Sequence, residues 1–471
     1  MTAASSPITS QNRLTLAMLL DSVTATHPLV AASRARERAA EAIRSTAGVY
    51  GNPVFGFEVD NTPFPGAAPV PASSGLQREN MTTLTVPLEP IYQRGARVRQ
   101  ADAEVRAARA DAAAERLRIS RQASEAFYRA AIAQVGVDVL RDLTGWLDTV
   151  VAYNQSRVRE GATAEADLIR TEVERDRAMA EETMQEAGLV RARAVLLSYL
   201  GDSPASVSSD EDAHLRIAAG DEPLPLPPNG LVNARSLPIG IALRTDTSSN
   251  SVRARGQLTL SDRPDVVAAR ERVTASTAGI ATQNALLVRQ LGATIGLKQS
   301  AGASTMIAGV SFPLPVFDQN RGEVARARAE GDIATYELAD RKRTARAEVE
   351  GAREAAELLT ARVALLSGAT SENTQLSTQD TSRAIGILGR AEESRRIALG
   401  AYREGAVPLI QVLDAARAWG DARLTFYRTL YAQHESVLDL LAAQGIDLRE
   451  AVSTMSPRPT TGDESPTRTP Q

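Results

Sequence analysis

Two aspartates occupy comparable places in the two halves of this sequence. Asp167 follows the tetrapeptide Arg-Glu-Gly-Ala at residues 159–162, and Asp414 follows a second copy of it at residues 403–406. If several copies of the chain form a ring, each carboxylate repeats around the axis, and such a ring of acids favours cations. The two aspartates therefore indicate, as one candidate chemistry, a negatively charged constriction.

Other side chains that could do chemistry are few and scattered. The three histidines, His27, His214 and His434, lack the spacing of metal ligands. His27 precedes a proline at an expected helix start and His214 lies in an expected linker, so we interpret both as solvated. The chain has no cysteine, which excludes disulfides, thiolate metal sites and a cysteine nucleophile. The sequence shows no phosphate-binding loop and no nucleophile elbow, so we expect no enzyme, no cofactor and no metal site.

Each Arg-Glu-Gly-Ala copy interrupts a long helical stretch and predicts the tip of a helical hairpin. The candidate tip residues are Arg159, Glu160, Gly161, Arg403, Glu404 and Gly405. Glycine can end a helix in the left-handed conformation, after which Thr163 or Pro408 would start the returning helix. We expect both tips at the same end of the molecule, ~100 Å from the predicted strands at 1.5 Å per residue. The two aspartates then lie one to two turns into the returning helices.

The sequence repeats itself once, with an offset of roughly 225–245 residues. Val86-Pro87-Leu88 is matched by Phe312-Pro313-Leu314, and His27-Pro28 by Arg263-Pro264. We predict a first repeat in residues 1–230, with strands at about 53–60 and 81–89 and a helical hairpin at about 94–200. A second repeat in residues 231–455 has strands at about 290–298 and 305–316 and a hairpin at about 321–445. Residues 456–471 are predicted to form a disordered tail.

The two hairpin segments consist mainly of strong helix formers and carry apolar residues with a seven-residue spacing. Residues 91–203 and 316–407 contain no proline and are rich in Ala, Arg, Glu and Leu. One series reads Val98, Val105, Ala112, Ile119, Ala126, Ala133, Leu140 and Leu147. After the first tip it continues as Ala166, Ile169, Val173, Ala180, Ala187, Val190, Ala194 and Leu197. This period predicts left-handed supercoiling of neighbouring helices, and an ordinary coiled-coil hairpin also explains it.

Four segments of about 8–11 residues alternate between apolar and small or polar residues, as strands do. The apolar positions are Phe55, Phe57 and Val59; Leu84, Val86 and Leu88; Leu291, Ala293, Ile295 and Leu297; and Met306, Ala308, Val310, Phe312 and Leu314. The pattern is compatible with a half-buried soluble sheet and with an outer-membrane barrel. Because the smallest barrels have about eight strands, several chains would have to share one. The loop Asn61–Arg78 is expected to be long, Gln299–Thr305 short, and Gly201–Ser261 an extended linker.

The net charge, the apolar segments and the first residues limit the partners and the location that we expect. Lys and Arg number 53 against 57 Asp and Glu, giving a net charge of −4, so no nucleic acid is expected. No segment has the apolar length of a transmembrane helix. Residues 1–12 are polar and lack the apolar stretch of a signal peptide, so an exported protein would be a processed form.

As a set, the motifs resemble a TolC-type outer-membrane efflux factor, in its cobalt-zinc-cadmium (CzcC-like) heavy-metal branch. The resemblance covers roughly residues 14–445 and is carried by Asn52-Pro53, residues 82–88 with Arg94-Gly95, residues 309–322, and Tyr402-Arg403-Glu404-Gly405. It implies a mixed, mainly α fold: a homotrimer with a long periplasmic α-barrel and a shared twelve-stranded outer-membrane β-barrel, four strands per protomer. Such proteins are exit ducts of tripartite pumps.

The resemblance also assigns partners and site residues. A periplasmic adaptor would bind the two tips, an inner-membrane RND transporter would drive export, and outer-membrane lipid would surround the barrel. The acidic periplasmic gate falls on Asp414, with Gln411 replacing a second acid and Asp167 as the counterpart in the first half. Because no cysteine is present for lipidation, we expect anchoring by the barrel. Two alternatives stay open: a drug-efflux or type I secretion duct of the same fold, and a soluble periplasmic coiled-coil scaffold.

Overall fold

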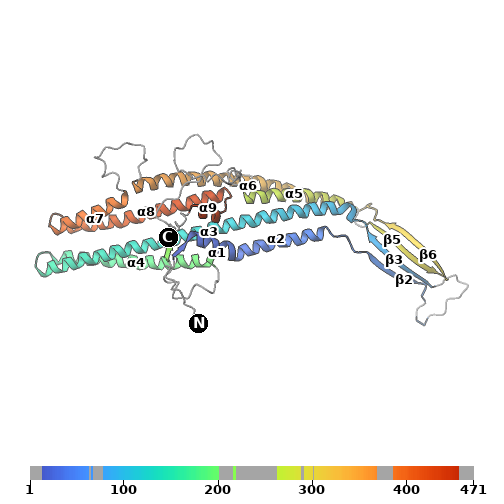
Figure 1. Ribbon diagram of the computed structural model, residues 1–471, viewed down its shortest axis with the longest axis horizontal. Helices are drawn as coiled ribbons and strands as arrows, with labels where there is room; N and C mark the ends of the chain where they lie inside the picture. Colours follow the sequence, from blue (N-terminus) through green and yellow to red (C-terminus); the bar gives the residue numbers. More distant parts are fainter. Residues whose placement is uncertain are drawn as a thin grey trace, which may run out of the picture. The chain divides into compact units, whose positions relative to one another are not determined.

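The computed structural model describes residues 13–62, 65–66, 78–200, 216–218, 262–287, 291–300, 302–368 and 386–455. The chain divides into two compact units, and each draws on both halves of the sequence (Figure 1). The sheet unit comprises the described parts of Ala32–Ala114 and Leu260–Thr344. The helical unit comprises those of Met1–Ala31, Glu115–Thr259 and Ala345–Gln471. The fold is therefore mainly helical with a small sheet, as predicted.

The sheet unit is built on one antiparallel sheet in the order β2-β3-β5-β6. Its strands are β2 (Val54–Asp60), β3 (Glu79–Pro87), β5 (Gly292–Ser300) and β6 (Ala303–Ser311). Its helices are α2 (Pro28–Ala47), α5 (Pro264–Ala285) and the first parts of α3 (Pro90–Arg159) and α6 (Arg321–Ser367). All four predicted strands are confirmed, and the pairing of β3 with β5 joins the two halves of the sequence.

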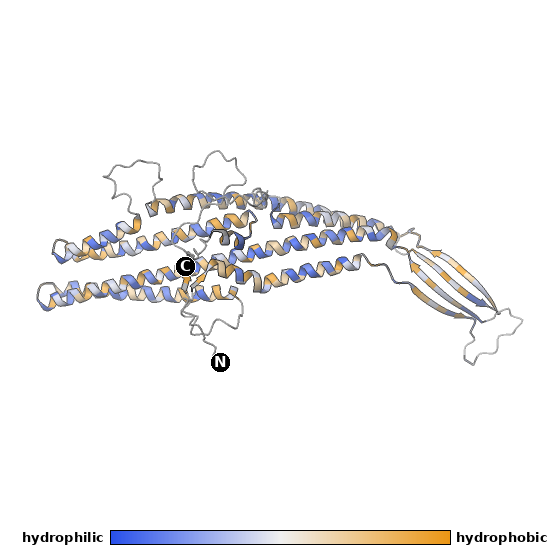
Figure 2. Cartoon of the chain, in the orientation of Figure 1, coloured by the Kyte–Doolittle hydropathy of each residue, from blue (hydrophilic) through white to orange (hydrophobic). Residues whose placement is uncertain are grey.

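The register places most of the apolar residues of the four strands on one face of the sheet. One row across the sheet reads Phe55, Leu84, Ile295 and Ala308. The next row, on the opposite face, contains Gly56, Thr83, Gly296 and Ile307, because neighbouring residues of a strand point to opposite faces. Most of the apolar strand residues thus share the first face, and Ile307 and Met81 lie on the second. Figure 2 shows apolar residues along the four strands. Phe55 and Leu297 are 68% and 60% exposed, so this apolar face has little cover within the chain.

One expectation about the strands needs correction. The last strand was predicted at about 305–316, but β6 begins at Ala303 and ends at Ser311. Pro313 and Pro315 follow, and a proline has no backbone N–H to donate to a neighbouring strand. The short connection between β5 and β6 contains Gly302 with φ +78°, which favours glycine. Most of the predicted loop Asn61–Arg78 lies outside the described residues.

Ion pairs from α3 fasten it to both neighbouring helices of the sheet unit. Arg109 contacts Glu37 and Glu41 of α2 at 2.9 and 2.6 Å, and Arg106 contacts Glu271 of α5 at 2.8 Å. These side chains are substantially exposed, so each pair contributes at most about 1 kcal/mol. Together these pairs connect α3 to α2 and α5.

The helical unit contains two helical hairpins that reverse at the predicted tips. The first consists of the remainder of α3 and α4 (Glu165–Leu200), and the second of α7 (Ile387–Arg403) and α8 (Leu409–Ala443). The unit also contains the end of α6, α1 (Leu16–Thr26), α9 (Leu448–Met455) and a short parallel pair of β1 (Arg13–Thr15) with β4 (Arg216–Ala218). Within the described part of the chain, no helix is both long and apolar enough to cross a bilayer.

The second predicted hairpin, at about 321–445, is interrupted. Helix α6 ends at Ser367, Gly368 has φ +78°, and the next helix begins after Gly386. Glycine is a poor helix former and readily adopts this left-handed conformation. Residues 369–385 lie outside the described residues, as do the predicted linker Gly201–Ser261 apart from β4 and the predicted tail 456–471.

The seven-residue series has different outcomes on the two helices of the first hairpin. On α3, Val105, Ile119 and Leu147 are buried, as predicted. On α4, Ile169 and Val173 of the series are 53% and 59% exposed. The residues that α4 buries instead are Thr171, Ala178, Leu189 and Leu196. The predicted stripe on α4 is therefore apolar surface that other parts of this chain leave uncovered.

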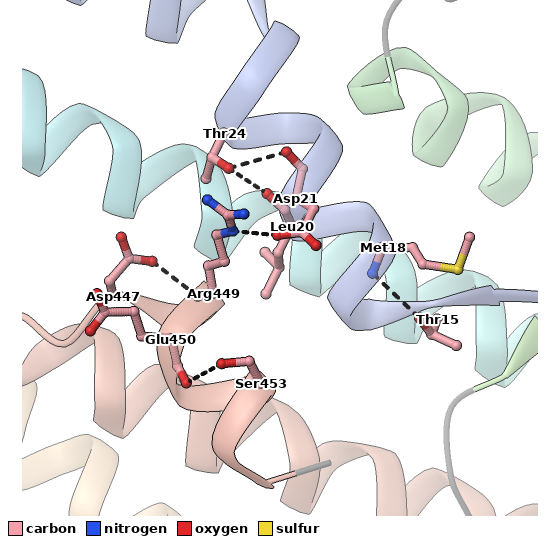
Figure 3. A network of polar contacts seen from close by, with 9 residues as sticks. All are labelled: Thr15, Met18, Leu20, Asp21, Thr24, Asp447, Arg449, Glu450 and Ser453. Atoms are coloured by element: carbon pink, nitrogen blue, oxygen red, sulfur yellow. Dashed lines mark hydrogen bonds and ion pairs between the residues drawn. The ribbon is translucent and has the colours of Figure 1, made fainter. Parts of the chain in front are cut away.

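Helices α1 and α9 pack together in the helical unit through polar contacts as well as apolar ones (Figure 3). Arg449 of α9 pairs with Asp21 of α1. The hydroxyl of Thr15 accepts the N–H of Met18 at 3.3 Å and caps the start of α1. Around them, Leu19, Leu20 and Leu448 lie in the main apolar core.

Candidate functional site

The two predicted tips have the same backbone structure. Gly161 and Gly405 have φ +70° and +75°. The N–H of Ala162 bonds to the carbonyl of Arg157 at 2.8 Å, and the N–H of Ala406 bonds to that of Ala401 at 2.8 Å. This is the Schellman arrangement, in which a left-handed residue closes the helix end. The first returning helix begins at Glu165, two residues later than Thr163, and the second begins at Leu409 after Pro408.

The two tips adjoin at one end of the helical unit. A cavity of about 430 Å³ lies between them. Its lining comes from both turns and includes Arg157, Thr163, Asp167, Tyr402, Gly405 and Pro408. The prediction that both tips lie at the same end is thus confirmed (Figure 1).

A buried chain of hydrogen bonds joins the hairpins just inside the tips. The hydroxyl of Tyr402 donates to Oδ1 of Asn154 at 2.7 Å. The amide of Asn154 donates to the hydroxyl of Thr171 at 3.0 Å, which donates to the carbonyl of Asp167 at 2.8 Å. Asn154 and Thr171 are both 0% exposed. Burial raises the pKa of Tyr402 above its ordinary value, so the phenol stays protonated and keeps its donor role.

The sequence contains a signal for this network that the predictions did not include. Asn154 stands seven residues after Leu147 and therefore occupies the next position of the apolar series on α3. A polar residue at such an inward position costs stability unless it is hydrogen-bonded, and it then fixes which helices pair and in which register. The partner in α7 could not be identified from spacing alone.

The predicted tip residues lie at the surface, and two arginines share one aromatic ring. Arg403 of the second tip lies with its guanidinium carbon 5.9 Å from the ring centre of Tyr153 on α3. Arg157 approaches the same ring at 5.7 Å. Arg159 donates to the backbone carbonyl of Gln155 at 3.3 Å. Arg159, Glu160, Gly161, Arg403, Glu404 and Gly405 are all exposed.

The predicted gate residues lie in the first two turns of α4 and α8. Asp167 is in the first turn of α4, which begins two residues later than expected, and is partly buried. Gln411 and Asp414 are exposed near the start of α8. Arg417 lies 3.2 Å from Asp414 and 2.5 Å from Glu174 of α4. The hydrogen bond to Glu174 raises the pKa of Arg417. Asp414 and Glu174 thus both pair with Arg417.

A second cluster, also missed from the sequence, attaches α7 to the other helices. The guanidinium of Arg395 lies 5.6 Å from the ring centre of Trp146 on α3 and 4.0 Å from that of Trp419 on α8. Its side chain is only 16% exposed. A desolvated arginine over tryptophan is worth up to about 2 kcal/mol. The cluster thus holds α7 against α3 of the first hairpin and α8 of its own hairpin.

The described histidines are packed against aromatic rings. His27 stacks on Tyr199 with ring centres 5.8 Å apart, and burial together with Arg118 lowers its pKa. It is therefore less solvated than predicted. His434 is buried beside Tyr128 and Tyr431, and His214 lies outside the described residues. Among the residues that the structure describes, no three His, Cys, Asp or Glu side chains gather into a possible metal site.

Comparison with known proteins finds a likeness in sequence to a resistance protein and a likeness in fold to several solved structures. No family model matches the sequence. The chain is 25% identical over 361 residues to the cobalt-zinc-cadmium resistance protein CzcC of Cupriavidus metallidurans, covering 75% of this chain and 74% of that protein. The outer-membrane channel OprN has a TM-score of 0.67 at 19% identity, covering 91% of this chain and 89% of the other. The outer membrane protein VceC of Vibrio cholerae has 0.65 at 18% identity, covering 91% and 96%.

The two solved structures are similar to this chain in fold, and the CzcC protein is similar to it in sequence. The resemblance predicted from the motifs is confirmed. The chain has the fold of the TolC-type outer-membrane efflux channels, and in sequence it resembles a cobalt-zinc-cadmium resistance protein.

Proposed function

We propose that this chain is the outer-membrane exit duct of a tripartite RND-type efflux system that exports heavy-metal cations. One observation supports this proposal above the others. The chain has a sheet with an exposed apolar face, and it also has two helical hairpins whose tips adjoin. The metal class comes from the likeness to the cobalt-zinc-cadmium resistance protein. The duct is passive, and a periplasmic adaptor couples it to a proton-driven transporter in the inner membrane.

The duct is a homotrimer that closes one twelve-stranded barrel in the outer membrane. In the described sheet, β2 and β6 are the outermost strands, and exposed strand edges invite pairing with another chain. Four strands are too few for a barrel, and three copies supply twelve. The exposed stripe of α4, with Ile169 and Val173 on it, supports helix packing between copies as well.

The two tips bind the adaptor, and their charges contribute to that contact. Arg403→Glu and Arg159→Glu are each expected to reduce co-purification of the adaptor with the duct. Both guanidiniums are exposed at a turn, where reversal turns attraction into repulsion. Arg396→Glu is the matched control, because Arg396 is equally exposed on α7 but pairs with Glu393 of its own helix. Unchanged adaptor recovery with both tip variants would refute this assignment.

The ring of gate residues narrows the periplasmic entrance. Asp414→Ala shortens the side chain and breaks the ion pair with Arg417. We expect higher single-channel conductance and weaker cation preference in planar bilayers, because a ring of carboxylates attracts cations. Arg417→Ala leaves the carboxylate without its counter-charge and is expected to strengthen cation preference instead. Identical current records for both variants and the parent protein would remove Asp414 from the gate.

A growth experiment tests the function as a whole. A strain lacking this protein is expected to grow poorly on zinc, cobalt, nickel, copper or silver salts and to recover when the gene is supplied in trans. Sensitivity to dyes without metal sensitivity would favour a drug-efflux duct of the same fold. A protein that fractionates with soluble periplasmic proteins without detergent would favour the coiled-coil scaffold and contradict the duct.

A further inference from the structure

A single residue, His27, joins helices α1 and α2. It follows the last residue of α1 and precedes the first residue of α2, and its backbone is extended, with φ −61° and ψ 129°. Its N–H donates to the carbonyl of Val23 at 3.2 Å and so closes α1. Its carbonyl accepts the N–H groups of Val30 and Ala31 at 3.0 and 3.1 Å and so opens α2. Both helix ends therefore depend on this residue.

The imidazole of His27 completes the start of α2. The first four N–H groups of a helix have no acceptor inside it. In α2 the first residue is Pro28, which has no N–H, and the third and fourth N–H groups donate to the carbonyl of His27. The second, that of Leu29, donates to Nδ1 of His27 at 3.3 Å. Nδ1 can accept it only while the imidazole is neutral, because the protonated ring donates from both nitrogens.

The charged and titratable groups around His27 come from two other helices of the helical unit. Tyr199, near the end of α4, stacks on the imidazole with ring centres 5.8 Å apart. Arg118 and Glu115 of α3 act on it electrostatically and pair with each other at 2.6 Å. On α1 and α2 themselves, His27 is the only charged or titratable residue between positions 22 and 33. The guanidinium is thus the one cation that acts on this ring.

Protonation would work against this arrangement in three ways. Nδ1 would become a donor and face the N–H of Leu29. The new charge would lie at the N-terminus of α2, where the helix dipole disfavours a cation, and it would be repelled by Arg118. Burial, followed by Arg118, lowers the pKa of His27, and Glu115 opposes them. The folded chain therefore favours the neutral ring.

The residues on both sides of His27 are anchored in the helical unit. Val23 and Val30 are 0% and 1% exposed and belong to the main apolar core. The hydroxyl of Ser22 donates to the carbonyl of Leu200 at 3.1 Å and ties α1 to the end of α4. The chain passes from the helical unit into the sheet unit shortly afterwards, after Ala31. A loosened start of α2 would thus affect the segment that connects the two units.

We propose that His27 is a proton-operated switch, which holds the start of α2 while the imidazole is neutral and releases it when the imidazole takes up a proton. The stabilisation is complete above the ordinary histidine pKa of about 6.5. It is lost as the pH falls through the lower pKa that His27 has in the folded chain. The ligand of this switch is the proton. This inference does not depend on the proposed duct, because the groups involved all lie in the helical unit.

Hydrogen exchange of the full chain in detergent tests the switch. Exchange of the amides at positions 29–31 would be followed by mass spectrometry at about pH 8 and about pH 5, on either side of the ordinary histidine pKa, and corrected for the intrinsic rate at each pH. In the parent protein, protection is expected to fall about fivefold at the lower pH, as for the loss of one helix cap. In His27→Asn it should stay the same, because asparagine accepts the same N–H and does not titrate.

The second repeat supplies an internal control. Helix α5 also begins with a proline, Pro264, but the preceding Arg263 makes no side-chain cap and cannot titrate in this range. Protection at the start of α5 should therefore be equal at the two pH values. Arg118→Gln is expected to reduce the fall at α2, because the pKa of His27 then rises toward its ordinary value and the folded and open forms differ less in proton binding.

Three results would overturn the proposal. One is the absence of a fall in the parent protein, and another is an equal fall in the parent protein and His27→Asn, which would place the titrating group elsewhere. The third is a fall in Arg118→Gln as large as in the parent protein or larger, since the switch requires this guanidinium to oppose the charge. Should His27→Asn fail to assemble, His27→Ser gives the same comparison, because serine is also a favoured cap that does not titrate.

Discussion

Replacing Ile295 by arginine is expected to abolish assembly of the protein in the outer membrane. Ile295 lies near the middle of β5 on the apolar face and is 53% exposed. An arginine on the lipid face of a barrel costs about 2–4 kcal/mol near the bilayer midplane, and a trimer would carry it three times. The measurement is the amount of folded oligomer in the outer-membrane fraction, seen as a band that dissociates only on heating.

Thr294→Arg is the matched control for this variant. Thr294 is the preceding residue and therefore points to the opposite face, where its hydroxyl lies 2.9 Å from that of Thr85. Its replacement removes one hydroxyl pair worth about 1 kcal/mol and places the charge in the aqueous interior. We expect near-normal assembly. Equal recovery of Ile295→Arg and Thr294→Arg would contradict the assignment of the apolar face to lipid.

Removing Asn154 is expected to loosen the tips and to lower the melting temperature. Asn154→Leu deletes the partner of both Tyr402 and Thr171 inside a buried site. A buried polar group left without its partner costs about 1–3 kcal/mol. Because these bonds join α3, α4 and α7, we also expect higher single-channel conductance. Thermal unfolding in detergent and bilayer recording measure the two effects.

A double-mutant cycle separates this network from a general loss of packing. Tyr402→Phe alone leaves Oδ1 of Asn154 without its donor and is expected to destabilise by a similar amount. When both partners become apolar the cost largely disappears, so the double variant should be clearly more stable than the sum of the two single variants predicts. Tyr153→Phe is the control, because that hydroxyl only accepts a 3.4 Å contact from Arg157. Strictly additive losses would show that the bond from Tyr402 to Asn154 contributes nothing specific.

Local sequence signals predicted the strands and the turns well. Alternation identified all four strands, and the repeated Gly161 and Gly405 identified both tips, because these signals act over a few residues. The end of β6 was placed too far along, since apolar alternation continues through Pro313 and Pro315 although hydrogen bonding cannot. Alternation reports the environment of side chains, and here it continues beyond the last residue of the strand.

Contacts between residues far apart in the sequence could not be predicted from residue spacing. The contacts between Arg395 and the two tryptophans join residues far apart in sequence, and no local pattern signals such a meeting. The apolar series on α4 was visible in the sequence, but its exposure in the single chain was not, because a heptad pattern cannot tell whether its partner is the same chain or another. The roles of Asp414, Gln411 and Asp167 stay predictions, as do those of the tips.

The proposed duct requires three copies of the chain to close their sheets around one pore. Light scattering of the protein extracted from outer membranes in detergent, corrected for bound detergent, gives the number of chains per particle. The expected result is three chains, with insertion into vesicles after the detergent is removed. A particle of one chain that stays in solution without detergent would contradict the proposed duct.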